Sequence, residues 1–432
     1  MKKKAAIITL GCSKNLVDSE RLLYRLKQAD YDVEHNGNYQ NKDLVLVNTC
    51  GFIQDAKQES IDLLMDLIAA KKEGEIKEIR VFGCLSERYR EELKKEIPEI
   101  DAYYGTYELE QIYKDLKLSF TKGDINNREL TSAKHYAYVK ISDGCDRTCS
   151  FCAIPIIKGK HRSRPMESIL AECNYLANKG VKEIILIAQD LSYYGLDIYK
   201  KNALADLLNE ISKIKSIVWV RMHYLYPNHF PYEVLDVMQN NPKVCNYMDI
   251  ALQHISNHQL DVMRRNIDKE SIESLINIMK KKVPNIAIRT TMLVGHPFET
   301  EQDFEELLDF VEDVKFDRLG AFTYSHEDNT YAFLNYEDNV AEDVKIQRLN
   351  QLMDLQQNIS YQLNQDKIGN SYQVIIDREE EEYFVGRTEF DSPEVDNEVL
   401  IEKDKKIAVG EFYQIKITSS DDFDLYGKLQ KV

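Results

Sequence analysis

The sequence lacks the features that would place it in a membrane or outside the cell. No run of apolar residues approaches the roughly 20 that a membrane-spanning helix needs. The apolar stretch Ala5–Leu10, which follows three lysines, has six residues, fewer than the roughly 7–15 of a secretion signal. We therefore expect a cytoplasmic protein with no membrane attachment.

Basic charge is also scarce. The 432 residues include 56 Lys and Arg against 73 Asp and Glu, which gives a formal net charge of −17. Nucleic-acid backbones attract positive charge, so we do not expect direct, generic nucleic-acid binding. Hydrophobic residues make up 43% of the chain and charged residues 30%, which is typical of a soluble globular protein and excludes disorder as its main state.

Cysteine is too rare for a disulfide scaffold, with eight residues in the whole chain and none after position 245. Grouped cysteines in a reducing compartment indicate metal binding or catalysis instead. Cys173 and Cys245 stand apart from the others, and we expect both to be buried core residues. The remaining cysteines form two groups of three: Cys12, Cys50 and Cys84, and Cys145, Cys149 and Cys152.

Residues 1–118 alternate between strand and helix patterns, which predicts an N-terminal parallel α/β domain. A cysteine follows each predicted strand. Because parallel strands bring their carboxyl ends to one edge of a sheet, we expect Cys12, Cys50 and Cys84 to lie together there. The predicted strands are Ala5–Leu10, Leu44–Val47 and Ile79–Phe82, and the predicted helices are Leu16–Gln28, Ala56–Ala70 and Glu87–Glu96.

The alternation restarts in residues 131–364 and predicts six strand–helix units, a full or partial parallel barrel of the TIM type. The chemistry of such barrels lies at the C-terminal ends of the strands, and a cysteine group follows the first strand here. The predicted strands are Tyr136–Ile141, Glu183–Ala188, Val218–Met222, Met248–Leu252, Ile286–Leu293 and Leu319–Tyr324, and a long helix is predicted over Val340–Asn364.

Residues 365–432 change to short strands without helices, which predicts a small five-stranded antiparallel β-barrel of the OB-like kind. Its aromatic residues suit either base stacking or the barrel core. Residues 363–432 hold 17 acidic and 9 basic side chains, a net charge of −8. The predicted strands are Tyr372–Ile376, Tyr383–Gly386, Glu398–Ile401, Phe412–Ile417 and Leu425–Leu429, and the aromatics are Tyr372, Phe384, Phe390 and Tyr413.

Cys145, Cys149 and Cys152 form a CxxxCxxC array. Three thiolates within eight residues wrap one metal centre and leave a fourth coordination position open. A structural zinc would need a fourth ligand from elsewhere in the chain, whereas iron–sulfur clusters use closely spaced thiolates. An iron–sulfur cluster is the favoured interpretation, and a zinc loop is the alternative.

This array, with Phe151 before the last cysteine, resembles the radical S-adenosylmethionine superfamily. The resemblance implies a [4Fe–4S] cluster on Cys145, Cys149 and Cys152 that binds S-adenosylmethionine and cleaves it to a 5′-deoxyadenosyl radical. The first cysteine group and the three predicted domains resemble the methylthiotransferases of that superfamily over essentially the whole chain. That resemblance implies a second [4Fe–4S] cluster on Cys12, Cys50 and Cys84, which carries the sulfur.

Several motifs are similar to the RimO type within that family, among them Thr9–Glu20, Cys152–Pro155 and Met263–Arg265. RimO-type enzymes methylthiolate the β-carbon of an aspartate in the twelfth protein of the small ribosomal subunit, and the resemblance also implies a low-potential electron donor and a sulfur donor. The alternative within the family is a transfer-RNA adenosine (MiaB type). The acidic C-terminal region favours a basic protein as the substrate. A non-catalytic electron carrier or zinc scaffold is the alternative outside the family.

Two segments depart from the family pattern, Ala188–Leu191 and Gly295–Thr300. Gln189 and Asp190 are therefore candidates for cofactor contacts and equally for loop capping. A basic run follows the second cysteine group and is interpreted as a solvated face or, alternatively, as a site for a carboxylate. It comprises Lys158, Lys160, His161, Arg162 and Arg164.

Overall fold

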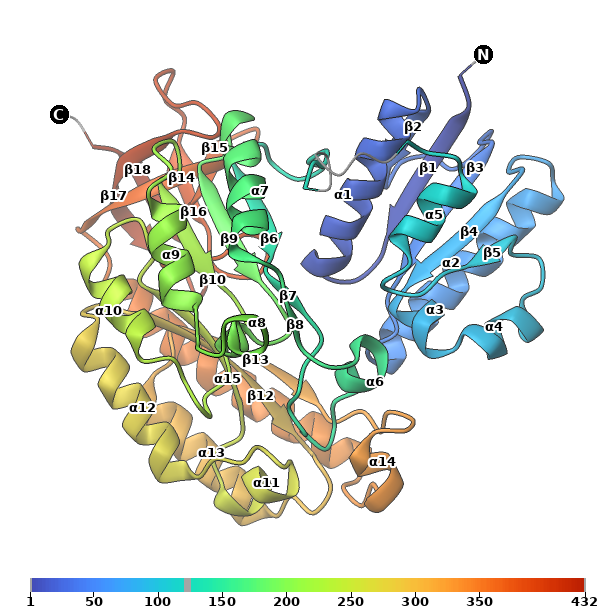
Figure 1. The fold of residues 1–432 in the computed structure, drawn as a ribbon. Coiled ribbons are helices and arrows are strands. Elements are labelled where there is room, and N and C mark those ends of the chain that lie inside the picture. The colour runs from blue at the N-terminus through green and yellow to red at the C-terminus, as the bar shows by residue number, and fades with distance from the viewer. Residues whose placement is uncertain (1, 120–125, 431–432) are drawn as a thin grey trace.

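The computed structural model describes residues 2–119 and 126–430. Residue 1, at the start of the predicted first domain, and residues 431–432, at the end of the predicted third domain, lie outside the described residues. An N-terminal α/β domain stands beside a larger central α/β domain, and a small β-barrel caps one end of the central domain (Figure 1). None of the described helices is both long and apolar enough to span a membrane.

The N-terminal domain is a five-stranded parallel sheet in the order β2-β1-β3-β4-β5. The three predicted strands are present, and two short strands that the pattern did not predict extend the sheet on both sides. The predicted helix Glu87–Glu96 is two helices that meet at Tyr89. The elements are β1 (Lys4–Thr9), α1 (Ser13–Gln28), β2 (Asp32–His35), β3 (Leu44–Thr49), α2 (Gln54–Lys72), β4 (Ile79–Gly83), α3 (Cys84–Arg88), α4 (Arg90–Glu96), β5 (Ala102–Tyr103) and α5 (Leu109–Asp115).

The central domain contains the six predicted strands as two three-stranded sheets, β6-β9-β10 and β11-β12-β13. Parallel bridges between Val220 and Val244 and between Leu225 and Ile250 connect them into one curved layer. The elements are β6 (Tyr136–Lys140), β7 (Ser142–Asp143), α6 (Ile154–Lys158), β8 (Arg162–Ser163), α7 (Met166–Asn178), β9 (Glu183–Ile187), η2 (Leu191–Tyr193), α8 (Leu196–Tyr199), α9 (Leu204–Ser212), β10 (Trp219–Met222), α10 (Glu233–Asn240), β11 (Tyr247–Gln253), α11 (Asn257–Val262), α12 (Lys269–Lys282), β12 (Ala287–Val294), α13 (Glu301–Val314), β13 (Arg318–Thr323), α14 (Tyr331–Asn335) and α15 (Glu342–Gln365).

Helices cover the outer face of this partial barrel, while the N-terminal domain faces its inner side (Figure 1). Val17 of α1 packs with Tyr136 and Tyr138 of β6 and with Ile185 and Ile187 of β9 in one buried cluster. The open side of the barrel is therefore closed in part by another domain. The largest core cluster lies between the outer face of the strands and the helices.

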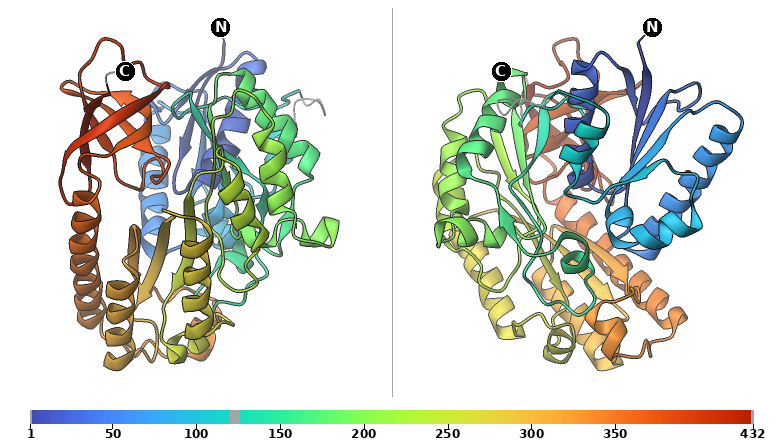
Figure 2. Two further views of the ribbon diagram at one scale, coloured as in Figure 1. Left: turned by 90° about the vertical axis from the view of Figure 1, so that its left-hand side faces the viewer. Right: turned by 45° about the vertical axis from the view of Figure 1, so that its right-hand side comes forward.

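The C-terminal domain is a closed barrel in the order β14-β15-β16-β18-β17. The predicted five strands are present, but the prediction of a wholly antiparallel barrel is wrong at one pair, because β16 and β18 run parallel. Figure 2 shows the long helix α15 leading to this barrel. The strands are β14 (Ser371–Glu379), β15 (Tyr383–Thr388), β16 (Val399–Glu402), β17 (Phe412–Ser420) and β18 (Leu425–Leu429).

The C-terminal barrel docks at the N-terminal ends of the central strands. Asp377 lies 2.7 Å from the imidazole of His135, just before β6, and Arg387 lies 2.7 Å from Glu183, the first residue of β9. Phe412 packs edge-on against Trp219, the first residue of β10. The cysteine loop follows the other end of β6, so the barrel and this loop lie at opposite ends of the central sheet.

Candidate active site between two cysteine triplets

Cys145, Cys149 and Cys152 lie in one loop between β7 and α6. The loop is closed at its base by the β7–β8 pair and by the backbone N–H of Cys145, which donates to the carbonyl of Gly159 at 3.1 Å. Gly144 has φ +79°, and a Cβ atom there would come within 2.1 Å of the Lys160 carbonyl. The sequence therefore needs glycine at this position to bring the two ends of the loop together.

Side chains from two later loops, the one after β10 and the one between α11 and α12, contact the middle cysteine of this triplet. Arg265 donates from Nη1 to Cys149 Sγ at 3.2 Å, and the hydroxyl of Tyr226 lies 3.4 Å from the same sulfur. The guanidinium of Arg265 also stacks 4.0 Å from the centre of the Tyr226 ring. The guanidinium thus places a buried positive charge directly beside this sulfur.

Asp190 and Gln189 follow β9 at the same edge of the sheet. Asp190 accepts hydrogen bonds from Arg147 Nε and from the backbone N–H of Ser192, both at 2.8 Å, which fits the capping interpretation. Arg147 lies between the rings of Tyr193 and Tyr226, 3.9 Å from each. Within the described residues, two buried polar atoms here have no partner: Gln189 Oε1 and Arg147 Nη2.

The other three cysteines lie together at the carboxyl edge of the N-terminal sheet, as predicted. Cys12 precedes α1, Cys50 follows β3, and Cys84 is the first residue of α3. A Cβ atom on Gly11 would lie only 2.9 Å from Cys50 Sγ, so the first two cysteine loops are in direct contact.

Asn15 of α1 ties these loops to one another. Its Nδ2 donates to the carbonyls of Leu10 at 2.9 Å and Thr49 at 3.2 Å, and its Oδ1 lies 4.0 Å from Cys84 Sγ. One side chain thereby contacts the segments that carry all three cysteines. The Thr9–Glu20 motif places this asparagine on the first turn of α1.

Burial and nearby charges give the thiols different acidities. Burial raises the pKa of the Cys84 thiol to about 11 and that of Cys145 to about 12. At Cys12 the surrounding protein also raises the pKa, but Lys14 and the backbone N–H groups of Asn15 and Lys14 outweigh it, so the net shift is downward. Binding a positive metal centre would favour the thiolate at every one of these sites.

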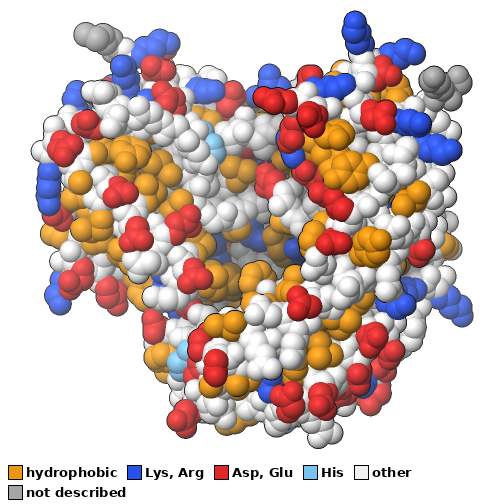
Figure 3. Space-filling view, turned by 180° about the vertical axis from the view of Figure 1, so that it is seen from behind, with side chains coloured by type: hydrophobic (Ala, Val, Ile, Leu, Met, Phe, Trp, Pro, Cys, Tyr) orange, Lys and Arg blue, Asp and Glu red, His pale blue; other side chains and the backbone are white. Residues whose placement is uncertain are grey.

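The two triplets approach each other across the domain interface. Cys84 forms a small buried cluster with Ala153 and Ile157, which lie directly after Cys152 and within α6. Between the N-terminal and central domains the surface is deeply hollowed, and basic side chains are visible within the hollow (Figure 3).

The basic run after the cysteine loop is not a uniform solvated face. Lys160 and Arg162 are exposed, whereas Lys158 and His161 are buried. Arg164 forms an ion pair of 2.8 Å with Glu172, which is fully buried. The run thus divides into surface residues, a structural arginine and the buried Lys158 beside the first cysteine triplet.

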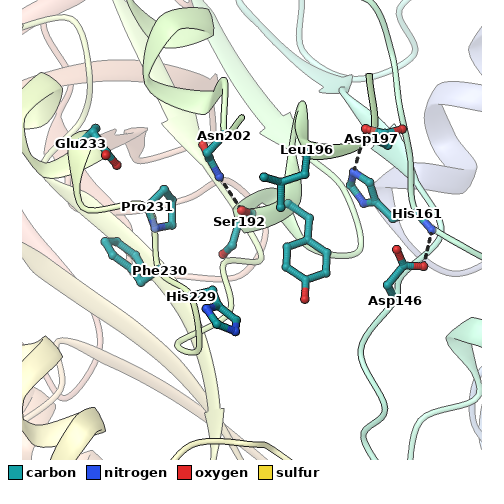
Figure 4. A pocket seen from close by; sticks show the side chains of 11 residues that line it. Asp146, His161, Ser192, Leu196, Asp197, Asn202, His229, Phe230, Pro231 and Glu233 are labelled. Atoms are coloured by element: carbon teal, nitrogen blue, oxygen red, sulfur yellow. Dashed lines mark hydrogen bonds and ion pairs between the residues drawn. The ribbon is translucent and has the colours of Figure 1, made fainter. Parts of the chain in front are cut away.

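A pocket of about 640 Å³ adjoins the cysteine loop on the side of Asp146 (Figure 4). His161 lies beside Asp197 in this pocket, and its backbone N–H donates to Asp146 at 3.0 Å. Asn202 donates to the carbonyl of Ser192 at 2.6 Å. The lining residues are Asp146, His161, Ser192, Tyr193, Leu196, Asp197, Asn202, His229, Phe230, Pro231 and Glu233.

The segment Gly295–Thr300, which departs from the family pattern, forms a rigid end to β12. His296 is buried, lies 3.0 Å from the Ser150 hydroxyl, and burial lowers its pKa to about 3, so it is neutral at physiological pH. The backbone N–H of Gly295 donates to Glu299 at 2.7 Å. The isolated Cys173 and Cys245 are buried in the core, as predicted.

The donor set suits clusters better than a single ion. Among residues 2–119 and 126–430, no three His, Cys, Asp or Glu side chains converge as one metal ion requires. In an iron–sulfur cluster each thiolate binds a different iron atom, so the three sulfurs lie farther apart than around a single ion. Two triplets of thiols without a fourth protein ligand fit this requirement.

Comparison with known families assigns the three parts of the chain. Residues 139–311 match the radical SAM superfamily, residues 368–429 match the TRAM domain, and residues 4–105 match the family described as uncharacterized protein family UPF0004. These matches confirm the predicted fold class. The domain limits 1–118, 131–364 and 365–432 stay predictions.

Solved structures share the fold at low sequence identity. The radical S-adenosylmethionine methyltransferase TsrM from Kitasatospora setae, solved with cobalamin and a [4Fe–4S] cluster, superposes with a TM-score of 0.54 at 15% identity over 75% of each chain. The cobalamin-dependent S-adenosylmethionine radical enzyme OxsB superposes with a TM-score of 0.51 at 15% identity, over 81% of this chain and 56% of that one.

Curated relatives match over nearly the full length. The ribosomal protein uS12 methylthiotransferases RimO of Parabacteroides distasonis and Bacteroides thetaiotaomicron are each 52% identical, over 99% of this chain and 99% and 98% of their own. That of Cytophaga hutchinsonii is 51% identical over 100% of this chain and 98% of its own. The chain therefore belongs to the RimO family of radical S-adenosylmethionine methylthiotransferases.

Proposed function

We propose that the chain transfers a methylthio group to the β-carbon of an aspartate in ribosomal protein uS12. The observation that carries this proposal is the contact between Cys84 and α6, which brings the two cysteine triplets to one interface. Sulfur donation and radical formation need adjacent sites, and this contact provides them. The relatives at 52% identity are named for the same reaction.

We assign Cys145, Cys149 and Cys152 to the [4Fe–4S] cluster that binds S-adenosylmethionine. The two unpaired atoms beside this loop suit the cofactor, because Gln189 Oε1 accepts a hydrogen bond and Arg147 Nη2 donates one. An amino group and a carboxylate, which the cofactor has, are their natural partners. In this assignment Asp190 is a positioning residue that orients Arg147.

We assign Cys12, Cys50 and Cys84 to the second [4Fe–4S] cluster. When bound, the two clusters and S-adenosylmethionine supply the radical, the sulfur and the methyl group. The chain's own residues hold the site around them: Asn15 fixes the three cysteine loops, and Arg265 donates a hydrogen bond to Cys149 Sγ.

The reaction also needs electrons and a renewed supply of sulfur. We infer a low-potential electron donor and a sulfur donor as transient partners, because the chain contains neither a flavin-binding motif nor a third cysteine group. Ribosomal proteins are made and assembled in the cytoplasm, so we place the reaction there.

Anaerobic reconstitution of the purified chain tests this function. Enzyme with both clusters, S-adenosylmethionine and a reductant should convert a peptide from uS12 to a product whose mass contains one added methylthio group. Transfer RNA serves as the competing substrate. Modification of transfer RNA, with no change in the peptide, would overturn the proposal in favour of the transfer-RNA reaction.

A further inference from the structure

Lys158 is a buried cation that no part of the assigned chemistry uses. It is the last residue of α6 and is only 3% exposed. Among the described residues, no carboxylate oxygen lies within the 4.0 Å of an ion pair from its ammonium group, and the centre of the Tyr107 ring lies 5.9 Å away. A buried cation without an ion pair is a site that an anion from a ligand can complete.

The carboxylates nearest to Lys158 are engaged by another lysine. Asp18 and Asp143 both act on its ammonium group from a distance, but Lys140 lies 2.8 Å from Asp18 and 3.2 Å from Asp143. Ile157, the residue before Lys158 in α6, packs with Cys84 in one buried cluster, so Lys158 lies beside the first cysteine triplet.

A second lysine approaches the same triplet from the N-terminal domain. Lys14, on the first turn of α1, places its ammonium group 3.4 Å from the centre of the Tyr224 ring, across the domain interface. Within the described part of the chain it has no carboxylate partner either. Lys14 stands two residues after Cys12, so this second cation also lies at the first triplet.

We propose that Lys158 and Lys14 bind the carboxylate of the substrate aspartate beside the sulfur-carrying triplet. A carboxylate accepts charge-assisted hydrogen bonds from two ammonium groups, and its β-carbon is then held next to the thiol site. The assignment rests on the proposed function, because it requires an aspartate as the target. Binding by two lysines also gives a physical reason for the enzyme to select an aspartate over an uncharged nucleobase or an amide side chain.

The test measures the binding of two peptides to the holoenzyme under anaerobic conditions. One peptide is the fluorescein-labelled segment of uS12 with its target aspartate, and the other carries asparagine at that position. The wild type should bind the aspartate peptide about tenfold more tightly, the difference that one charge-assisted contact provides. Lys158→Met should abolish this preference, and Lys14→Met should reduce it.

The controls separate carboxylate binding from effects on folding and on the cofactors. Lys213→Met, on the exposed end of α9, should keep the full preference, and Lys158→Met should not lower the thermal midpoint because it removes an unpaired charge. Lys213→Met should also cleave S-adenosylmethionine without peptide at the wild-type rate.

Three outcomes would contradict the assignment. Equal losses of affinity for both peptides would mean that Lys158 only balances the charge of the cluster. Loss of S-adenosylmethionine cleavage without peptide would mean that the cofactor's carboxylate is the partner. In both cases the wild type still converts the aspartate peptide, so the proposed function stands. A wild type that cleaves the cofactor but converts no peptide would overturn the proposed function together with the assignment.

Discussion

The N-terminal domain and the C-terminal barrel dock on the same central domain in different ways. At the barrel, the buried charges of the interface are paired: Glu183 binds Arg221 at 2.8 Å and Arg387 at 2.7 Å, and Asp391 binds Arg318. At the N-terminal domain, ion pairs such as that of Arg88 with Glu327 border a region in which, among the described residues, Lys158 has no ion pair and both cysteine triplets are free of disulfide bonds.

The difference indicates which interface holds the chemistry. Complete pairing fixes geometry, whereas unpaired reactive groups next to a hollow surface are expected where ligands bind. It also changes the meaning of the acidic C-terminal region. Several of its carboxylates are used to dock on the central domain, so its charge of −8 is weaker support for a basic partner than the sequence suggested. The carboxylates in docking contacts are Asp377, Glu389, Asp391 and Asp396.

The largest effects on activity should come from substitutions of the cysteines. The two triplets should differ in which step their loss abolishes. Cys149→Ala should reduce cleavage of S-adenosylmethionine to the level seen without enzyme, because the open-site cluster loses a ligand. Cys50→Ala should leave that cleavage largely intact but abolish sulfur insertion. The products, 5′-deoxyadenosine and the methylthiolated peptide, are quantified separately by mass spectrometry. Cleavage retained by Cys149→Ala would contradict the assignment of the two triplets.

At the C-terminal interface, Glu183→Gln should be the most damaging single change. The carboxylate is fully buried between two arginines, and removing its charge takes the ion-pair partner from Arg221 and leaves Arg387 with Asp377 alone, at a cost of about 3–5 kcal/mol. Chemical unfolding measures the loss. The iron content of the folded fraction should stay at the wild-type value, because the cysteines lie at the other end of the strands. Loss of iron at unchanged stability would contradict this division of roles.

The acid sensitivity of the N-terminal interface should depend on Glu172. Burial raises the pKa of the Glu172 carboxyl, but the nearby Arg164, Arg21 and Arg128 lower it by more. The net shift is from the usual 4.5 down to about 2. A depressed pKa stabilises the fold above pH 4.5, and this contribution disappears as the pH falls towards 2. The change amounts to about 3 kcal/mol. Urea unfolding at several pH values should show a smaller acid-induced loss in Glu172→Gln than in the wild type.

The regular parts of the fold could be predicted because their patterns are local. Apolar strands and helical stripes located the six central strands, and the cysteine after each N-terminal strand located the first triplet. Short edge strands carry little pattern: β2 alternates between exposed and half-buried residues, and β5 has only two residues. The parallel pairing of β16 with β18 depends on chain path rather than on residue type.

The charged residues of the site could not be predicted either, and the reason differs from the one that applies to the short strands. Lys158 and Arg164 stand in one basic run, yet the fold buries the lysine and half-buries the arginine, because α6 packs on α3 of another domain and Glu172 of α7 pairs with the arginine. Arg88 and Glu327, 239 positions apart, meet only in the folded chain. Partners so distant in sequence have no short, fixed spacing that a sequence motif could reveal.

The ion pairs of Glu327 lie at the interface between the N-terminal and central domains. Their loss should slow methylthiolation, which needs both cysteine triplets, more than it slows the cleavage of S-adenosylmethionine. Its carboxylate lies 2.9 Å from Lys57 and from Arg88, and Arg88 also donates to the carbonyl of Gly51, next to Cys50. Glu327→Gln should slow methylthiolation about tenfold, since one charged hydrogen bond is lost, while leaving cleavage of S-adenosylmethionine unchanged. Arg88 keeps its contact with the Asp328 carbonyl, so the fold should persist.

The smallest effect should come from an ion pair that belongs to the C-terminal barrel but to neither interface. Glu398 receives two hydrogen bonds from Arg378, at 2.5 and 2.7 Å, in a geometry as good as that of Glu183. Both side chains are exposed to solvent, where water screens the charges, so Glu398→Gln should cost at most about 1 kcal/mol. Compared with Glu183→Gln by the same unfolding measurement, this variant tests whether burial at the interface decides the energy. Equal losses for the two variants would mean that the barrel's own stability, and not its docking, is being measured.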